Sequence, residues 1–170
     1  MEHKRKQLPC AMAMAVLVTT IALAMTASAQ QASDAYDRAL QAAMQRASPD
    51  FRMQQPVMEG GGDSVYIRWI SDGARVSVWY FVRESAESAA QTLQERLSSL
   101  PIPNQRIDGF GDEAYLLAPS NPSGERKISF RKGATIFEVG APGEANARRF
   151  AALFDEAVGR STAGRGSNSR

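Results

Sequence analysis

The fold of this chain is decided by residues 64–82, which read SVYIRWISDGARVSVWYFV. Apolar side chains alternate along both halves of this stretch, which predicts two strands, residues 64–70 and 74–82. Asp72-Gly73 lies between them and readily supplies the two positive φ angles of a type I′ turn. The pairing that follows sets Trp69 opposite Val76, Ile67 opposite Val78 and Val65 opposite Tyr80. One face of this hairpin is therefore apolar and is predicted to lie in the core.

A second hairpin is predicted from Glu125 to Arg131 and from Ala134 to Val139, with its turn at Lys132-Gly133. In this register Ile128 faces Phe137, Phe130 faces Thr135, and Arg126 faces Val139. The other face pairs Lys127 with Glu138, opposite charges that stabilise neighbouring strands by a few tenths of a kcal/mol. We expect that second face to be in contact with water.

Three amphipathic helices are predicted from apolar residues that recur at helical spacing. They cover residues 33–47, with Ser33 as N-cap, residues 85–100, and residues 142–158, with Gly159 as the stop. A further strand is expected around residues 113–118. The order of these elements predicts an α+β fold with a five-stranded, mostly antiparallel sheet packed by amphipathic helices. The order of strands across the sheet is left open.

The N-terminal 29 residues have the form of a signal peptide. Lys4, Arg5 and Lys6 precede an apolar run from residue 8 to 25, and Ala27-Ser28-Ala29 supplies the small residues that signal peptidase requires. We expect cleavage after Ala29 and a periplasmic or secreted protein. The alternative is an uncleaved membrane anchor, since a run of about 18 residues nearly spans a bilayer. Cys10 lies near the start of the apolar run, whereas a lipid-anchored cysteine follows its end.

Cleavage would change the chemistry that is available to the chain. It removes the single Cys and the single His. It also removes three of the 20 basic residues and one of the 18 acidic residues, which leaves 17 basic and 17 acidic residues. Disulfides, Ser-His-Asp or Cys-His catalysis, and zinc sites of Cys and His ligands are then excluded. A neutral chain also gives no reason to expect nucleic acid or, after cleavage, a membrane as partner. No cofactor and no metal are predicted.

Residues 30–63 are read as the N-terminal helix followed by a linker that contains Gly60-Gly61-Gly62. This triplet lacks the preceding strand and following helix of a phosphate-binding loop. Residues 64–159 are predicted to form the α+β domain. Residues 160–170 are polar and small, and we expect them to be a disordered tail.

Two short patterns, GFGDEAY at residues 109–115 and FRKG at residues 130–133, precede a closing amphipathic helix. Together they resemble a pattern of small exported bacterial domains of unknown function, over residues 85–158. The order of elements also resembles the Mog1/PsbP-like α/β/α sandwich, in which helices cover both faces of the sheet. The resemblance implies an accessory, sensing or partner-binding role, and it implies no catalytic residue.

The sequence contains two candidate catalytic patterns. Ser129 and Lys132 match Ser-x-x-Lys, but in a strand they are expected to point to opposite faces of the sheet. Asp108, Asp112 and Glu113 offer oxygen ligands for calcium or an acid pair for glycoside hydrolysis. The spacing of a calcium loop is missing, so we expect a turn, shaped by Gly109 and Gly111, whose acids face water.

The best candidate for a binding site is the second face of the first hairpin. Its candidate residues are the aromatic and guanidinium side chains that are enriched where proteins bind partners, namely Tyr66, Arg68, Arg75, Trp79 and Phe81, beside Arg83. The alternative is that the N-terminal helix covers this face through Tyr36, Leu40 and Met44. The sequence thus predicts a non-enzymatic exported domain that binds a protein partner or an envelope ligand. A carboxylate-dependent hydrolase and a purely structural envelope protein are the alternatives, and the oligomeric state is left open.

Overall fold

An antiparallel sheet forms the middle layer of the computed structural model, which describes residues 33–54, 56–59, 64–119 and 124–163. Its strands are β1 (Arg52–Met53), β2 (Val57–Glu59), β3 (Ser64–Ser71), β4 (Ala74–Val82), β5 (Asn104–Ile107), β6 (Glu113–Leu117), β7 (Glu125–Lys132) and β8 (Thr135–Pro142). They follow the order β1-β3-β4-β8-β7-β6-β5, and β2 pairs with β3 next to β1. The α+β class and the antiparallel sheet are therefore confirmed.

The sheet has eight strands in the described part of the chain, and the prediction of five was wrong. The three missed strands are β1, β2 and β5. Two of them have two and three residues, and β5 is polar and largely exposed. None has the apolar alternation on which strand prediction depends. The segment predicted as a linker thus contains β1 and β2.

The first hairpin has the predicted register, including Trp69 opposite Val76 and Val65 opposite Tyr80. Its turn differs from the expected type I′. Gly73 has a φ of +76°, but no residue other than glycine has a positive φ in the described ranges, so Asp72 does not. A positive φ at the second central position alone is the pattern of a type II turn.

The second hairpin turns one residue later than predicted. Lys132 pairs with Thr135, so that Phe130 lies opposite Phe137 and Ile128 opposite Val139. Gly133, with a φ of +56°, is the first central residue of the turn, the position at which a type II′ turn takes glycine. The shift moves each pair by two residues, so the faces remain as predicted while the register was wrong.

Three helices pack on the sheet: the N-terminal helix (residues 33–47), α2 (Ala86–Ser99) and α3 (Glu144–Ala163). Ser85 caps α2, since its side chain accepts a hydrogen bond from the backbone N–H of Ser88. Ser33 is already helical, so the prediction of an N-cap there was wrong. Helix α3 continues past Gly159 to residue 163, which lies inside the predicted tail.

Gly159 has a packing role instead of ending the helix. A Cβ atom at this position would lie 2.8 Å from Nζ of Lys132. The same ammonium group donates hydrogen bonds to the backbone oxygen and to Oδ1 of Asp155, at 2.8 and 2.7 Å. The missing side chain therefore leaves room for the ammonium group of Lys132 beside α3.

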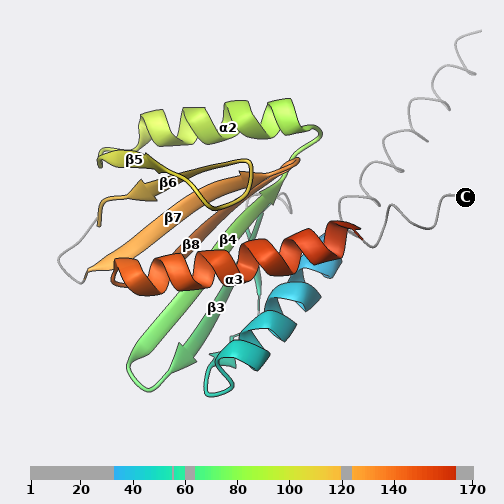
Figure 1. The fold of residues 1–170 in the computed structure, drawn as a ribbon, viewed down its shortest axis with the longest axis vertical. Helices are drawn as coiled ribbons and strands as arrows, with labels where there is room; N and C mark the ends of the chain where they lie inside the picture. Colours follow the sequence, from blue (N-terminus) through green and yellow to red (C-terminus); the bar gives the residue numbers. More distant parts are fainter. Residues whose placement is uncertain (1–32, 55, 60–63, 120–123, 164–170) are drawn as a thin grey trace, which may run out of the picture. The chain divides into compact units, whose positions relative to one another are not determined.

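The helices lie on both faces of the sheet (Figure 1). The N-terminal helix and α3 cover one face, where Tyr36 contacts Tyr80 and Phe137, and Trp69 contacts Phe154. Helix α2 covers part of the other face. No helix in the described ranges is both long and apolar enough to cross a bilayer. The predicted signal peptide and residues 164–170 of the predicted tail lie outside the described residues.

A buried polar cluster fixes the N-terminal helix to β4. The hydroxyl of Tyr80, a residue that is 1% exposed, donates to Oδ1 of Asp37 at 2.6 Å and lies 2.8 Å from Oγ of Ser33. Desolvation, and then the hydrogen bond to Asp37, raise the pKa of Tyr80 well above its ordinary value of 10.0. Desolvation also raises the pKa of Asp37.

The raised pKa of Tyr80 predicts a loss of stability in alkali. Above about pH 10 the unfolded chain loses the phenolic proton and the folded chain keeps it, so each pH unit lowers the free energy of unfolding by up to about 1.4 kcal/mol. The variant Tyr80→Phe should be about 1–2 kcal/mol less stable at pH 7, because it loses these hydrogen bonds. We expect this difference to shrink between pH 10 and 12 in urea unfolding curves. With Tyr115→Phe as control, a difference that stays constant for Tyr80→Phe would contradict the assignment.

Candidate functional site

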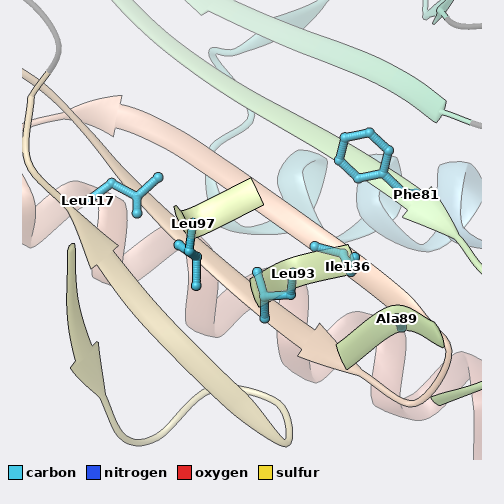
Figure 2. Packing of buried hydrophobic residues seen from close by; sticks show 6 residues of the cluster. All are labelled: Phe81, Ala89, Leu93, Leu97, Leu117 and Ile136. Atoms are coloured by element: carbon cyan, nitrogen blue, oxygen red, sulfur yellow. The ribbon is translucent and has the colours of Figure 1, made fainter. Parts of the chain in front are cut away.

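The second face of the first hairpin is divided into a covered and an uncovered part. Phe81 is 6% exposed and packs with Ala89, Leu93 and Leu97 of α2, as Figure 2 shows. Trp79 packs against the same cluster. These two of the five candidate residues therefore lie beneath α2.

The helix that covers this face is not the predicted one. The N-terminal helix, with Tyr36, Leu40 and Met44 buried, packs on the opposite face. The alternative that the N-terminal helix covers the candidate site was therefore wrong. The reason is that Tyr80, on the apolar face of the hairpin, supplies both the aromatic and the polar contacts of that helix.

Arg96 of α2 closes the covered part of the face. Its guanidinium carbon lies 4.7 Å from the ring centroid of Trp79 and 4.6 Å from that of Phe81. Nε1 of Trp79 is buried and has no hydrogen-bond partner within the described part of the chain. A buried donor without an acceptor costs stability, so this indole is held by packing and by the cation above it.

The uncovered part, here called the open strip, comprises described side chains of β1 to β4 on this face, namely Arg52, Val57, Tyr66, Arg68, Ile70 and Arg75. Val57 pairs with Tyr66, and Ile70 pairs with Arg52 and Arg75. Val57 is 50% exposed and Ile70 is 40% exposed. They are the exposed large hydrophobic residues in the described part of the chain. Both therefore lie on the same face as three of the predicted binding residues.

Tyr66 and Arg68 form one contact unit in the open strip. Nε and an Nη atom of Arg68 donate to the tyrosine hydroxyl at 3.1 and 3.0 Å, and the guanidinium carbon lies 5.2 Å from the ring centroid. Arg75, whose side chain is 52% exposed, forms an ion pair with Glu125 at 2.9 Å. The structure thus brings Tyr66, Arg68 and Arg75 together on the open strip.

Val57, Ile70 and Arg52 were not selected from the sequence as site residues. Ile70 was detectable, because strand alternation places it on the same face as Tyr66 and Arg68. Val57 and Arg52 were not, because β1 and β2 are too short to be recognised and lie in the segment read as a linker.

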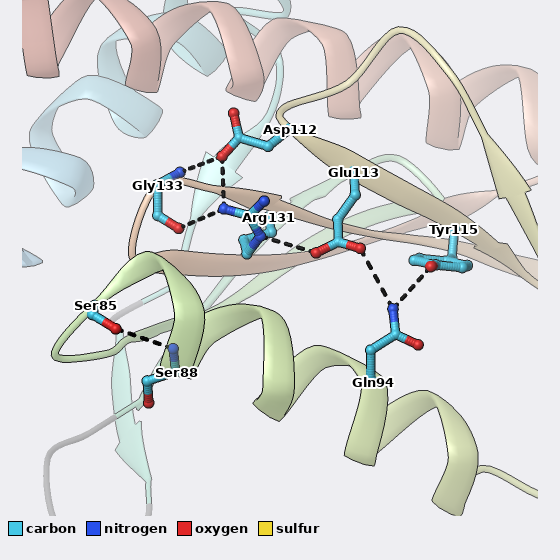
Figure 3. Close-up of polar contacts among 8 residues, drawn as sticks. All are labelled: Ser85, Ser88, Gln94, Asp112, Glu113, Tyr115, Arg131 and Gly133. Carbon is cyan, nitrogen blue, oxygen red and sulfur yellow. Dashed lines mark hydrogen bonds and ion pairs between the residues drawn. The ribbon is translucent and has the colours of Figure 1, made fainter.

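The GFGDEAY pattern and the FRKG pattern lie next to each other in the structure, as Figure 3 shows. Arg131 forms ion pairs with Asp112 at 2.8 Å and with Glu113 at 2.9 Å. Oδ2 of Asp112 also accepts a hydrogen bond from the backbone N–H of Gly133 at 2.8 Å. Asp112 and Glu113 therefore tie the β5–β6 connection to the β7–β8 hairpin. The expectation that the acids face water was wrong for Glu113, whose side chain is 16% exposed, whereas Asp108 and Asp112 are exposed.

The remaining catalytic candidates are kept apart. Ser129 pairs with Glu138 and is 3% exposed, whereas Lys132 bonds Asp155 on the other side of the sheet. The prediction that Ser129 and Lys132 point to opposite faces is confirmed. Asp108 is exposed on the connection between β5 and β6. No cluster of three or more His, Cys, Asp or Glu side chains suited to a metal occurs among the residues that the structure describes.

The predicted Lys127–Glu138 ion pair is present at 2.7 Å, although the two residues are diagonal neighbours and not opposite each other. Glu138 also pairs with Arg96 at 3.2 Å, and its side chain is only 9% exposed. The prediction that this face is in contact with water was thus wrong at Glu138, because α2 covers it. Lys127, whose side chain is 40% exposed, is separated from the open strip by Gly140 and Ser77.

A cleft of about 570 Å³ lies apart from these contacts, between the end of the N-terminal helix and the β3–β4 turn. Polar side chains line much of it, among them Gln41, Gln45, Asp50 and Asp72. The buried Trp69 and the partly buried Phe51 belong to its apolar part. Arg52 of the open strip borders this cleft, whereas none of the binding residues predicted from the sequence does.

Geometry alone characterises the candidate site. A comparison of the chain with protein-family models, with curated proteins and with solved structures finds no match.

Proposed function

We propose that this chain is an exported, non-enzymatic domain that binds a protein partner through the open strip. It is proposed to act in the periplasm or outside the cell, after cleavage behind Ala29, in an accessory or sensing role. The resemblance to small exported domains and to the Mog1/PsbP-like sandwich is part of this proposal.

The observation that carries the proposal is the position of the two exposed large hydrophobic side chains. Single exposed apolar residues are common on protein surfaces, but Val57 and Ile70 flank an aromatic residue and an arginine on one flat face. Tyrosine and arginine give much contact area at a small cost in conformational entropy, which is why they dominate interface energetics. A carboxylate-dependent hydrolase gains no support, since Asp112 and Glu113 are paired with Arg131.

Site-specific photocrosslinking tests the proposal. A benzophenone amino acid in place of Ile70 should form a discrete protein adduct in the exporting cell, and the same residue in place of Ser98 on α2 should not. Tyr66→Ala together with Val57→Ser should lower the adduct at least about fivefold, as expected where central contacts are worth 1 kcal/mol or more. Intact mass of the recovered protein should give a chain that begins at Gln30.

Two results would count against the proposal. Equal adducts from positions 70 and 98 would show that contact is not confined to the open strip. An adduct at position 70 that survives the double substitution, with the variant still folded by its melting curve, would show that Tyr66 and Val57 do not bind the partner.

A further inference from the structure

The charges and the shape of the open strip identify a kind of partner. We infer that the open strip binds an acidic segment of another protein in which carboxylates alternate with apolar side chains, an inference that rests on the proposed function. Arg52 and Arg68 would hold the carboxylates, and Val57, Tyr66 and Ile70 would contact the apolar side chains.

The positive charge of the open strip is not balanced by ion pairs at Arg52 and Arg68. No described carboxylate forms an ion pair with Arg52 or Arg68, and the polar contacts of Arg68 go to the neutral groups of Tyr66 and Gln54. Opposite charges across an interface steer association and fix the register of the partner. The guanidinium group suits a carboxylate particularly well, because its donors match both carboxylate oxygens.

Charged side chains of both signs continue along the face toward β7. Lys127 pairs with Gly140, Gly140 pairs with Ser77, and Ser77 pairs with Arg68. These four residues form one row across the sheet with a cation at each end. The two residues between them are small and buried. Lys127 shares Glu138 with Arg96, so that one carboxylate serves two cations. The carboxylate of Glu125 lies above Gly140 and Ser77, 3.5 Å from Oγ of Ser77, so the row carries a positive charge at each end and one negative charge between them.

Helix α2 lies on the same face of the sheet as the open strip (Figure 1). A helix packs about 10 Å above the layer beneath it, so α2 forms a step beside the open strip. A segment of chain fits beside this step, whereas a flat bilayer would meet α2 first. The geometry therefore favours a protein segment over an anionic lipid surface.

Binding of defined probes to the isotopically labelled protein, as recovered from the exporting cell, tests the inference by NMR. The probes are a capped hexapeptide in which aspartate alternates with leucine, its isostere with asparagine in place of aspartate, and phosphatidylglycerol vesicles. We expect the acidic peptide to shift the amide signals of β3 and the first half of β4, and to bind about tenfold more tightly than its isostere. Added salt should reduce this preference, because exposed charges are screened.

A pair of variants with equal change in net charge makes the test specific. Arg52→Gln with Arg68→Gln should remove most of the tenfold preference. Arg46→Gln with Arg106→Gln, at two exposed positions outside the open strip, should leave it unchanged. Equal losses in both variants would mean that net charge, and not the open strip, attracts the peptide, and would overturn the inference.

The remaining outcomes separate this inference from the proposed function. Equal binding of the two peptides would overturn the role of the carboxylates and leave the open strip as an apolar binding site. Binding to vesicles without binding to the acidic peptide would overturn the inference in favour of a lipid surface. If no probe binds while the crosslink at position 70 remains, the partner chemistry is wrong and the proposed function stands; if the crosslink also fails, both fall.

Discussion

Replacement of Phe137 by alanine is expected to lower the free energy of unfolding by about 4 kcal/mol, within the range known for buried phenylalanines. The side chain is fully buried, and its ring lies 5.1 Å from that of Phe130 and 5.7 Å from that of Tyr36. The cavity would thus open between the sheet and the N-terminal helix. Urea unfolding gives the loss, and hydrogen exchange should show residues 33–47 opening more often than the strands.

Phe110→Ala is the matched control, because this ring lies on the β5–β6 connection and is only partly buried. Phe110→Ala should lower the free energy of unfolding by about 1 kcal/mol, because the ring removes a smaller apolar area from water. Equal losses from the two variants would contradict the placement of Phe137 at the centre of the core. Unchanged exchange in residues 33–47 would contradict its contact with the N-terminal helix.

The second large effect is expected from Gly111→Ala, which should lower the free energy of unfolding by about 3 kcal/mol. Gly111 has a φ of +51°, and a Cβ atom there would lie only 2.1 Å from the backbone oxygen of Arg131. That oxygen accepts a hydrogen bond from the backbone N–H of Asp112 at 2.7 Å. The backbone must move, and the ion pairs of Asp112 and Glu113 with Arg131 should weaken with it.

Gly109→Ala separates the close contact from the backbone angle. Gly109 also has a positive φ, +95°, but no atom lies within 4 Å of its hypothetical Cβ. We expect Gly109→Ala to lower the free energy of unfolding by about 1–2 kcal/mol, through backbone strain alone. If calorimetry gives the same melting temperature for the two variants, the approach of residue 111 to Arg131 does not matter for stability.

The sequence predicted the elements that have strong local patterns. The first hairpin was correct to the residue pair, because alternation and Asp72-Gly73 specify the same register. Lys132-Gly133-Ala134 leaves two possible positions for a two-residue turn, and the structure uses the later one. The middle of each helix was predicted correctly, but two helix ends were not. Ser33 was expected to be an N-cap and Gly159 a stop, whereas both lie within a helix and against other parts of the fold.

The candidate site was predicted in part for a physical reason. Strand alternation places Tyr66, Arg68, Arg75, Trp79 and Phe81 on one face, which the structure shows. Which helix packs on which face depends on contacts between residues far apart in the sequence, such as Tyr80 with Asp37 and Phe81 with Leu93. No local pattern encodes these contacts, so the extent of the open strip had to come from the structure.

The interrupted edge beside β3 offers little template for strand-to-strand association. β1 and β2 share this edge of β3 and are separated by residues that include Pro56, which has no backbone N–H. The row of amide and carbonyl groups that a foreign strand would need as a template is broken into pieces of two and three residues. Short edge strands of this kind resist the growth of fibrils. A partner that binds the open strip, as proposed, would therefore be recognised by its contacts with side chains and not by main-chain pairing.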